Sequence, residues 1–136
     1  MPFTIADHTA DIRLNVTGAT LQELFRQALA GLIALLAGAG GVRGGDVASV
    51  VFRLSAPDSE SLLIDFLNEA LFVMQSRKAL IQEVRFSNLQ PQEAAGTFTL
   101  VPAAGFEKEI KAATYHDIHI RRRRDGSLQT SIVFDI

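Results

Sequence analysis

The fold is decided by one stretch of sequence, PDSESLLIDFLNEALFVM at residues 57–74. It opens on Pro57-Asp58-Ser59, a helix start signal, and apolar side chains then recur at helical intervals. Asp65, Asn68 and Glu69 fall nearer the polar side. The stretch therefore predicts an amphipathic helix with one buried face, formed by Leu62, Leu63, Phe66, Leu67, Ala70, Leu71 and Met74.

An earlier helix and two strands are predicted on the N-terminal side of this stretch. Thr20-Leu21-Gln22-Glu23 has the spacing of a capping box, and apolar residues recur at helical intervals from there to about Ala37. The glycine-rich segment 38–45 ends that helix. Residues 12–16 alternate between apolar and polar side chains, and residues 47–54 place apolar side chains on one face, so both are expected to be strands.

The remainder of the chain is rich in short β-type runs. Residues 80–89, 96–101, 110–123 and 128–134 are separated by turn residues, which predicts an antiparallel meander. Asp125-Gly126 is the sharpest turn signal and predicts a two-residue hairpin loop. Together the elements predict an α+β fold, an antiparallel or mixed β-sheet with two helices packed on one face, in a single domain over residues 1–136.

Composition sets limits on what the chain does. Its 136 residues are 48% apolar and 21% charged, with a formal charge of -2, which argues against bulk electrostatic binding of nucleic acid. There is no cysteine, so neither a disulfide framework nor a thiolate metal site is expected. No secretory signal and no run of about 20 apolar residues is visible, so we expect a cytosolic protein that does not bind membranes.

Ionisable residues occur in four clusters within otherwise apolar sequence. Each cluster has an ordinary structural explanation as well, such as a turn or a solvated helix face. The clusters are Asp7-His8-Thr9-Ala10-Asp11, Asp65 with Asn68-Glu69, Lys111 with His116-Asp117, and Asp135 beside Ile136.

Asp135 is the most informative of these residues, because it continues a strand pattern close to the end of the sequence, where chains usually fray. If the Asp125-Gly126 loop has two residues, counting back along the hairpin places His116 opposite Asp135. Several carboxylates that converge remain ionised only if a cation compensates them. Oxygen ligands favour calcium, magnesium or manganese over zinc.

Two groups of basic residues each allow more than one interpretation. Lys111 could offset the charge of the carboxylates or bind a phosphate, or it could be an ordinary surface lysine on a strand. The run from Arg121 to Arg124 could be a solvated hairpin end that protects a strand edge, or a docking surface for RNA or an acidic partner. No GxSxG, HExxH or paired-cysteine motif occurs, so hydrolase and zinc-protease chemistry has no support.

The four clusters, taken in order, resemble the archease family over essentially the whole chain. The motifs are His8-Thr9-Ala10-Asp11-Ile12, Leu62-Leu63-Ile64-Asp65-Phe66-Leu67-Asn68-Glu69, Ile110-Lys111-Ala112-Ala113-Thr114-Tyr115-His116-Asp117 and Val133-Phe134-Asp135-Ile136. The sequence departs from the family at Phe66, where tryptophan is frequent, and in its dense arginine run.

The resemblance implies an accessory protein that activates an RtcB-type RNA-splicing ligase by promoting guanylylation and multiple turnover, with indirect contact to RNA ends and guanine nucleotide. It implies metal ligands at Asp11, Asp135 and the main-chain or terminal oxygen of Ile136, with Ca²⁺ the usual ion and Mg²⁺ or Mn²⁺ as alternatives. It implies further that the same pocket is lined by Glu69, Lys111, His116 and His8.

Two other functions compete with that expectation. One is a general chaperone-like modulator of nucleic-acid-modifying enzymes, in which the pocket is merely structural and substitution of Lys111 or Asp11 leaves activation intact. The other is a stand-alone metal-dependent phosphohydrolase or nucleotidyl enzyme, which requires turnover by the purified chain. The absence of a nucleophile motif in the sequence argues against the latter.

Overall fold

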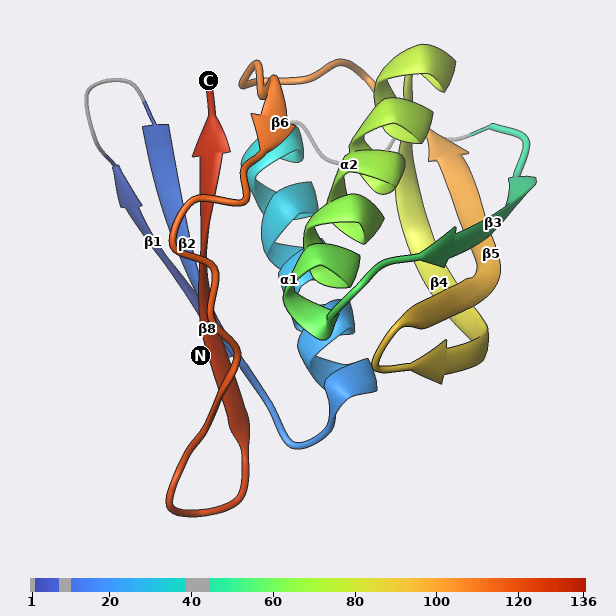
Figure 1. Cartoon of the computed structure of the whole chain (residues 1–136). Helices are drawn as coiled ribbons and strands as arrows, with labels where there is room; N and C mark the ends of the chain where they lie inside the picture. Colours follow the sequence, from blue (N-terminus) through green and yellow to red (C-terminus); the bar gives the residue numbers. More distant parts are fainter. Residues whose placement is uncertain (1, 8–10, 39–44) are drawn as a thin grey trace.

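Two antiparallel sheets enclose two helices (Figure 1). The computed structural model describes residues 2–7, 11–38 and 45–136. The first sheet has the order β1 (Phe3–Asp7), β2 (Asp11–Gly18), β8 (Leu128–Asp135) and β6 (Ala112–Ala113), with β7 (Arg121–Arg122) also paired to β8. The second sheet has the order β3 (Ala48–Ser55), β5 (Glu93–Pro102) and β4 (Ala79–Gln90). The helices are α1 (Leu21–Ala37) and α2 (Ser59–Arg77).

Both helices begin at the predicted caps. The Thr20 hydroxyl accepts a hydrogen bond from the Glu23 backbone N–H at 3.1 Å, and the Glu23 carboxylate accepts one from the Ala19 N–H at 3.0 Å. The Asp58 carboxylate accepts a hydrogen bond from the Ser61 N–H at 2.7 Å. At the other ends, α1 stops at Gly38 with φ 53°, and α2 stops at Lys78 in the left-handed region.

Aromatic rings join the helices to the second sheet. Phe66 of α2 is fully buried, and its ring centroid lies 5.3–5.8 Å from four other phenylalanine rings. These rings belong to Phe25, Phe52, Phe86 and Phe98. The first sheet adds Ile12, Leu14, Ile132 and Phe134, all fully buried. The core therefore extends from one sheet through the helices to the other.

The predicted α+β class, with two helices packed on one face of an antiparallel sheet, is confirmed. The predicted single meander from Leu80 onward is divided instead between two sheets. After β5 the chain crosses from one sheet to the other past the C-terminal ends of both helices, where the Ala103 N–H bonds to the Lys78 carbonyl and the Glu107 N–H bonds to the Leu36 carbonyl. The second sheet covers the side of the helices that faces away from the first (Figure 1).

The expected strand over residues 110–123 is also different. Within this range only β6 and β7 pair with β8, and the chain leaves the sheet after Thr114, whose N–H still donates to the Val133 carbonyl at 2.9 Å. β1, in contrast, was not predicted, because its run of alternating residues is short and ends at the Asp7–Asp11 cluster, for which a site and a turn were both left open. Neither α1 nor α2 has the length and apolar character that crossing a membrane requires.

Candidate functional site

Asp11 and Asp135 lie directly opposite each other where β2 and β8 pair. Residues in that relation have Cβ atoms about 4.5–5.5 Å apart. The register is fixed by the next pair along the strands, Ile12 and Phe134, because both side chains are fully buried on the helix side. A slip of one residue would turn these side chains out of the core. We call Asp11 and Asp135 the carboxylate pair.

Lys111 lies beside the carboxylate pair. On the other side of β8, Ala112 of β6 is opposite Asp135, and the Lys111 backbone N–H donates to the Asp135 carbonyl oxygen at 2.8 Å. The Lys111 side chain is exposed. The start of β2, the end of β8 and β6 lie at the same end of the first sheet (Figure 1). Asp11, Asp135 and Lys111, which directly precedes β6, are therefore neighbours at that end.

Helix α2 holds β6 in this position through Asn68. The Ala113 N–H donates to the Asn68 side-chain oxygen at 2.7 Å, and the Asn68 amide nitrogen donates to the Ala113 carbonyl at 3.0 Å. Gln75, two turns further along α2, donates to the Ile110 carbonyl at 2.9 Å. Glu69 is half-buried and follows Asn68 on the helix that packs on β6.

The same helix also holds the chain beyond β6. The Tyr115 hydroxyl donates a hydrogen bond to the Asp65 carboxylate. Because only the neutral phenol can donate this bond, the bond raises the pKa of Tyr115, and partial burial of the ring contributes less. The Ile120 N–H donates to the Glu60 carboxylate at 3.1 Å. Residues 110–120, which we call the strap, thus run antiparallel to α2 and are attached to it by four of its polar side chains.

His116 is not opposite Asp135, so the predicted hairpin register is wrong. Ala112 occupies that place, and His116 is exposed and contacts the Asp117 carboxylate at 3.2 Å. One reason is the turn, whose loop has three residues, 124–126, between Arg123 and Ser127, with Gly126 at φ 88°. The other reason is a difference in length between the two chains of the hairpin. Between the pairs Ala113–Phe134 and Arg121–Gln129, the strap has seven residues, 114–120, whereas β8 has four, 130–133.

Other predicted site residues differ in how far the structure describes them. Ile136 directly follows the carboxylate pair and is 36% exposed. His8 lies outside the described residues. Tyr115 and Gln75 were not singled out from the sequence as site residues. The spacing of Gln75, seven residues after Asn68, could have shown that both lie on one helix face, whereas nothing in the sequence indicates that Tyr115 bonds to Asp65.

The chemistry of the carboxylate pair suits a hard cation. Two carboxylates that face each other across a strand pair repel, and neither has an ion-pair partner among the described residues. A divalent cation bound to their oxygens would offset that repulsion. In the described part of the chain, no cluster of three or more His, Cys, Asp or Glu side chains could hold a metal, so main-chain oxygens and water would have to complete the ligand set.

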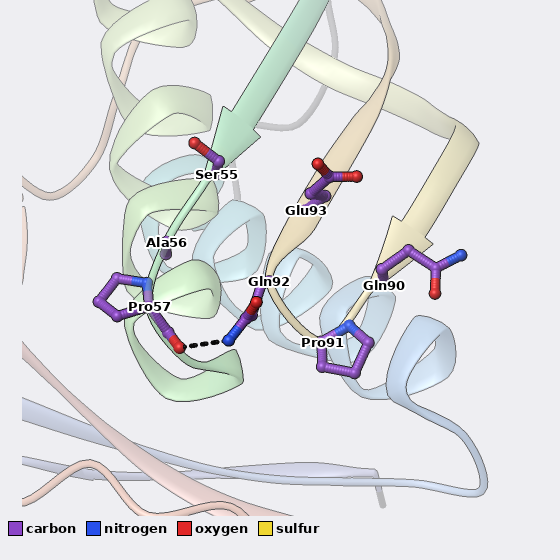
Figure 2. A pocket seen from close by; sticks show the side chains of 7 residues that line it. All are labelled: Ser55, Ala56, Pro57, Gln90, Pro91, Gln92 and Glu93. Carbon is purple, nitrogen blue, oxygen red and sulfur yellow. Dashed lines mark hydrogen bonds between the residues drawn. The ribbon is translucent and has the colours of Figure 1, made fainter.

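A separate pocket of about 770 Å³ opens at the N-terminal end of α2 (Figure 2). It lies between the β3–α2 connection and the β4–β5 turn, where the Gln92 side chain donates to the Pro57 carbonyl at 2.9 Å. Its lining carries a single ionisable side chain, Glu93, and contains none of the predicted site residues. We therefore place the candidate site at the carboxylate pair and not at this pocket.

Comparison with known proteins gives one consistent result. Residues 3–136 match the model of the archease protein family. The chain is 32% identical to the protein archease of Methanosarcina barkeri, over 96% of this chain and 92% of that one. It is 28% identical to the protein archease of Pyrococcus furiosus, over 96% and 95%.

Two solved structures share the fold. The crystal structure of an archease from Thermotoga maritima, described as a possible chaperone, has a TM-score of 0.70 and 25% identity, and covers 96% of this chain and 94% of that one. The solution structure of a protein from Methanobacterium thermoautotrophicum has a TM-score of 0.71 and 23% identity, and covers 99% of each chain. Because the family model spans nearly the whole sequence, including the carboxylate pair, the chain belongs to the archease family.

Proposed function

We propose that this protein is a cytosolic accessory factor that activates an RtcB-type RNA-splicing ligase in tRNA splicing and RNA repair, by promoting guanylylation of the ligase and its multiple turnover. Membership of the archease family supports the proposal. The observation that carries it is the register that places Asp11 opposite Asp135 at one end of the first sheet. The protein itself is proposed to carry out no complete reaction.

In this proposal the carboxylate pair and the main-chain or terminal oxygen of Ile136 hold a divalent cation, with Ca²⁺ favoured and Mg²⁺ or Mn²⁺ as alternatives. All of these ligands are oxygens, and the side chains of the carboxylate pair are held by strands with a buried register. The cation and the exposed Lys111 ammonium would present positive charge to a nucleotide phosphate. Phosphoryl transfer depends mainly on positioning and charge neutralisation, so such a pair could assist transfer to the ligase histidine.

The test is guanylylation of the cognate ligase with radiolabelled GTP, with and without this protein. We expect Asp135→Asn and Asp11→Asn each to abolish activation while the circular dichroism spectrum remains that of the native protein. Asp46→Asn is the matched control, because Asp46 is exposed and lies two residues before β3, a strand of the second sheet. Full activation by Asp135→Asn, or loss of activation with Asp46→Asn alone, would contradict the proposal.

A second candidate function is a general chaperone-like modulator of nucleic-acid-modifying enzymes. The description of the Thermotoga maritima archease as a possible chaperone favours it. In that case the carboxylate pair is structural, and variants that remain folded keep their effect on the client enzyme. The same assay separates the two functions, because only the ligase activator requires charge at Asp11 and Asp135.

A further inference from the structure

A polar groove of about 480 Å³ lies on the face of the first sheet that points away from the helices. Its walls come from β2, β7, β8 and the strap. The side chains that matter for binding are Arg13, Asp117, His119, Arg121, Gln129 and Ser131. None of them belongs to the carboxylate pair or to the residues that attach the strap to α2.

Strand register explains why the two arginines share a face. Ile12, Leu14 and Val16 of β2 are fully buried against the helices, so Arg13 points to the opposite face. Arg121 is opposite Gln129 on β8, which is exposed on that same outer face. The groove therefore has one guanidinium on β2 and one on β7, with β8 between them.

The two guanidinium groups have no ion-pair or hydrogen-bond partner among the residues that the structure describes. Asp117, the one acidic residue of the groove, lies 3.2 Å from His116. Arg122, in contrast, donates to the Gly126 carbonyl at 2.9 Å and so holds the hairpin turn. The lining therefore has two arginines and one acidic side chain, although the whole chain has a charge of -2, and Asp11 of the carboxylate pair lies on the same face of β2, two residues before Arg13.

The polar groups between the arginines are well fixed. The Thr130 hydroxyl donates to the His119 carbonyl at 2.7 Å and fixes this strap residue against β8. The Ser131 hydroxyl donates to the Asn15 side chain, whose amide in turn donates to the Thr4 hydroxyl at 3.2 Å. Because both hydroxyl protons are used within the protein, the side-chain donors that the lining leaves for an anion are the two guanidinium groups, the Gln129 amide and the His119 imidazole.

From these contacts we propose that the groove binds the phosphate groups of a single-stranded RNA through Arg13 and Arg121. Arginine forks bind phosphates in two-point contacts. The two arginines are separated laterally by two strand spacings and along β8 by four residues, so their Cα atoms are roughly 16 Å apart. That separation suits a strand with a phosphate on every nucleotide better than one mononucleotide.

Recognition in this groove would be independent of base sequence. Apart from the His119 imidazole, its lining contains no aromatic ring on which a base could stack. The exposed Arg123 and Arg124 at the hairpin end continue the positive charge beyond Arg121. The inference goes beyond ligase activation, because the contact with RNA belongs to this chain itself and is measurable without the ligase.

The test is fluorescence anisotropy of a labelled 12-nucleotide oligouridylate with the purified protein at several salt concentrations. The variant carries Arg13→Gln and Arg121→Gln. The control carries Arg53→Gln and Arg85→Gln, which remove the same charge from exposed positions of the second sheet. We expect the groove variant to bind at least about tenfold more weakly. The slope of log K against log salt should fall by about 1.4, which is about 0.7 for each phosphate contact of a single strand.

Three results would overturn the inference. The first is equal loss of affinity in the groove variant and the control, or no loss in either. The second is displacement of the RNA by uridine monophosphate at the concentrations at which unlabelled 12-mer displaces it, which would indicate a single-phosphate site. The third is equally effective displacement by a polyglutamate peptide, which would indicate an acidic protein partner. None of these results bears on activation of the ligase.

Discussion

Replacing Asn68 with alanine should separate the strap from α2 and destabilise the protein. Asn68 is the only described side chain that bonds to both backbone groups of Ala113, at 2.7 Å and 3.0 Å. The substitution leaves one N–H and one carbonyl without these partners. Each such group costs about 1–3 kcal/mol when fully buried, and because this site is only partly buried we expect about 2–3 kcal/mol in total.

The assay is urea denaturation, supported by thermal unfolding. For a chain of this length, 1 kcal/mol corresponds to about 3.5 °C, so Tm should fall by about 7–10 °C. Gln75→Ala is the matched control, since it removes a single hydrogen bond from the same strap at an exposed position and should cost about 1 kcal/mol or less. If Asn68→Ala were no more destabilising than Gln75→Ala, the reasoning that Asn68 anchors β6 beside Asp135 would be refuted.

Two further predictions concern the strap and the core. Tyr115 is the only tyrosine and the chain has no tryptophan, so its ionisation can be followed by ultraviolet absorbance without interference. The pKa of Tyr115 in the folded state is raised above 10.0, so the stabilisation from its hydrogen bond is present below pH 10 and is lost as the pH rises through the raised pKa. Asp65→Asn should lower the midpoint of the absorbance titration. An unchanged midpoint would show that the hydrogen bond is absent. Phe66→Ala removes the central ring of the aromatic cluster and should cost about 3–5 kcal/mol in urea denaturation, whereas a cost below about 1 kcal/mol would show that the ring does not hold α2 to the second sheet.

Local sequence signals were sufficient to predict both helices, their N-terminal caps and the strand that becomes β2. These features depend on spacing within a few residues, as at Thr20 with Glu23 and at Asp58 with Ser61. The division of the strands into two sheets depends on contacts between distant segments. The pairing of β2 with β8 joins Asp11 to Asp135 across 124 residues, and no local pattern encodes it.

The candidate site shows the same limit. Asp11 and Asp135 lie opposite each other, and the Lys111 backbone bonds to Asp135, but a shared metal site formed by these residues, as the family resemblance implies, stays a prediction. His116 was misplaced because its position depends on the length of the hairpin loop and on the outward course of the strap. Both depend on three-dimensional contacts, such as those of Asp65 with Tyr115 and of Glu60 with Ile120, that a count of residues along the hairpin does not include.

Calcium binding by the carboxylate pair is the claim on which the proposed function depends, and isothermal titration calorimetry with CaCl₂ tests it most directly. We predict one binding site in the wild type and none in Asp135→Asn. Calcium at 100 times its Kd should stabilise the wild type by about 2.7 kcal/mol, or about 9 °C in Tm, and leave the variant unchanged. Equal calcium binding by the wild type and Asp135→Asn, or none by the wild type, would contradict the account.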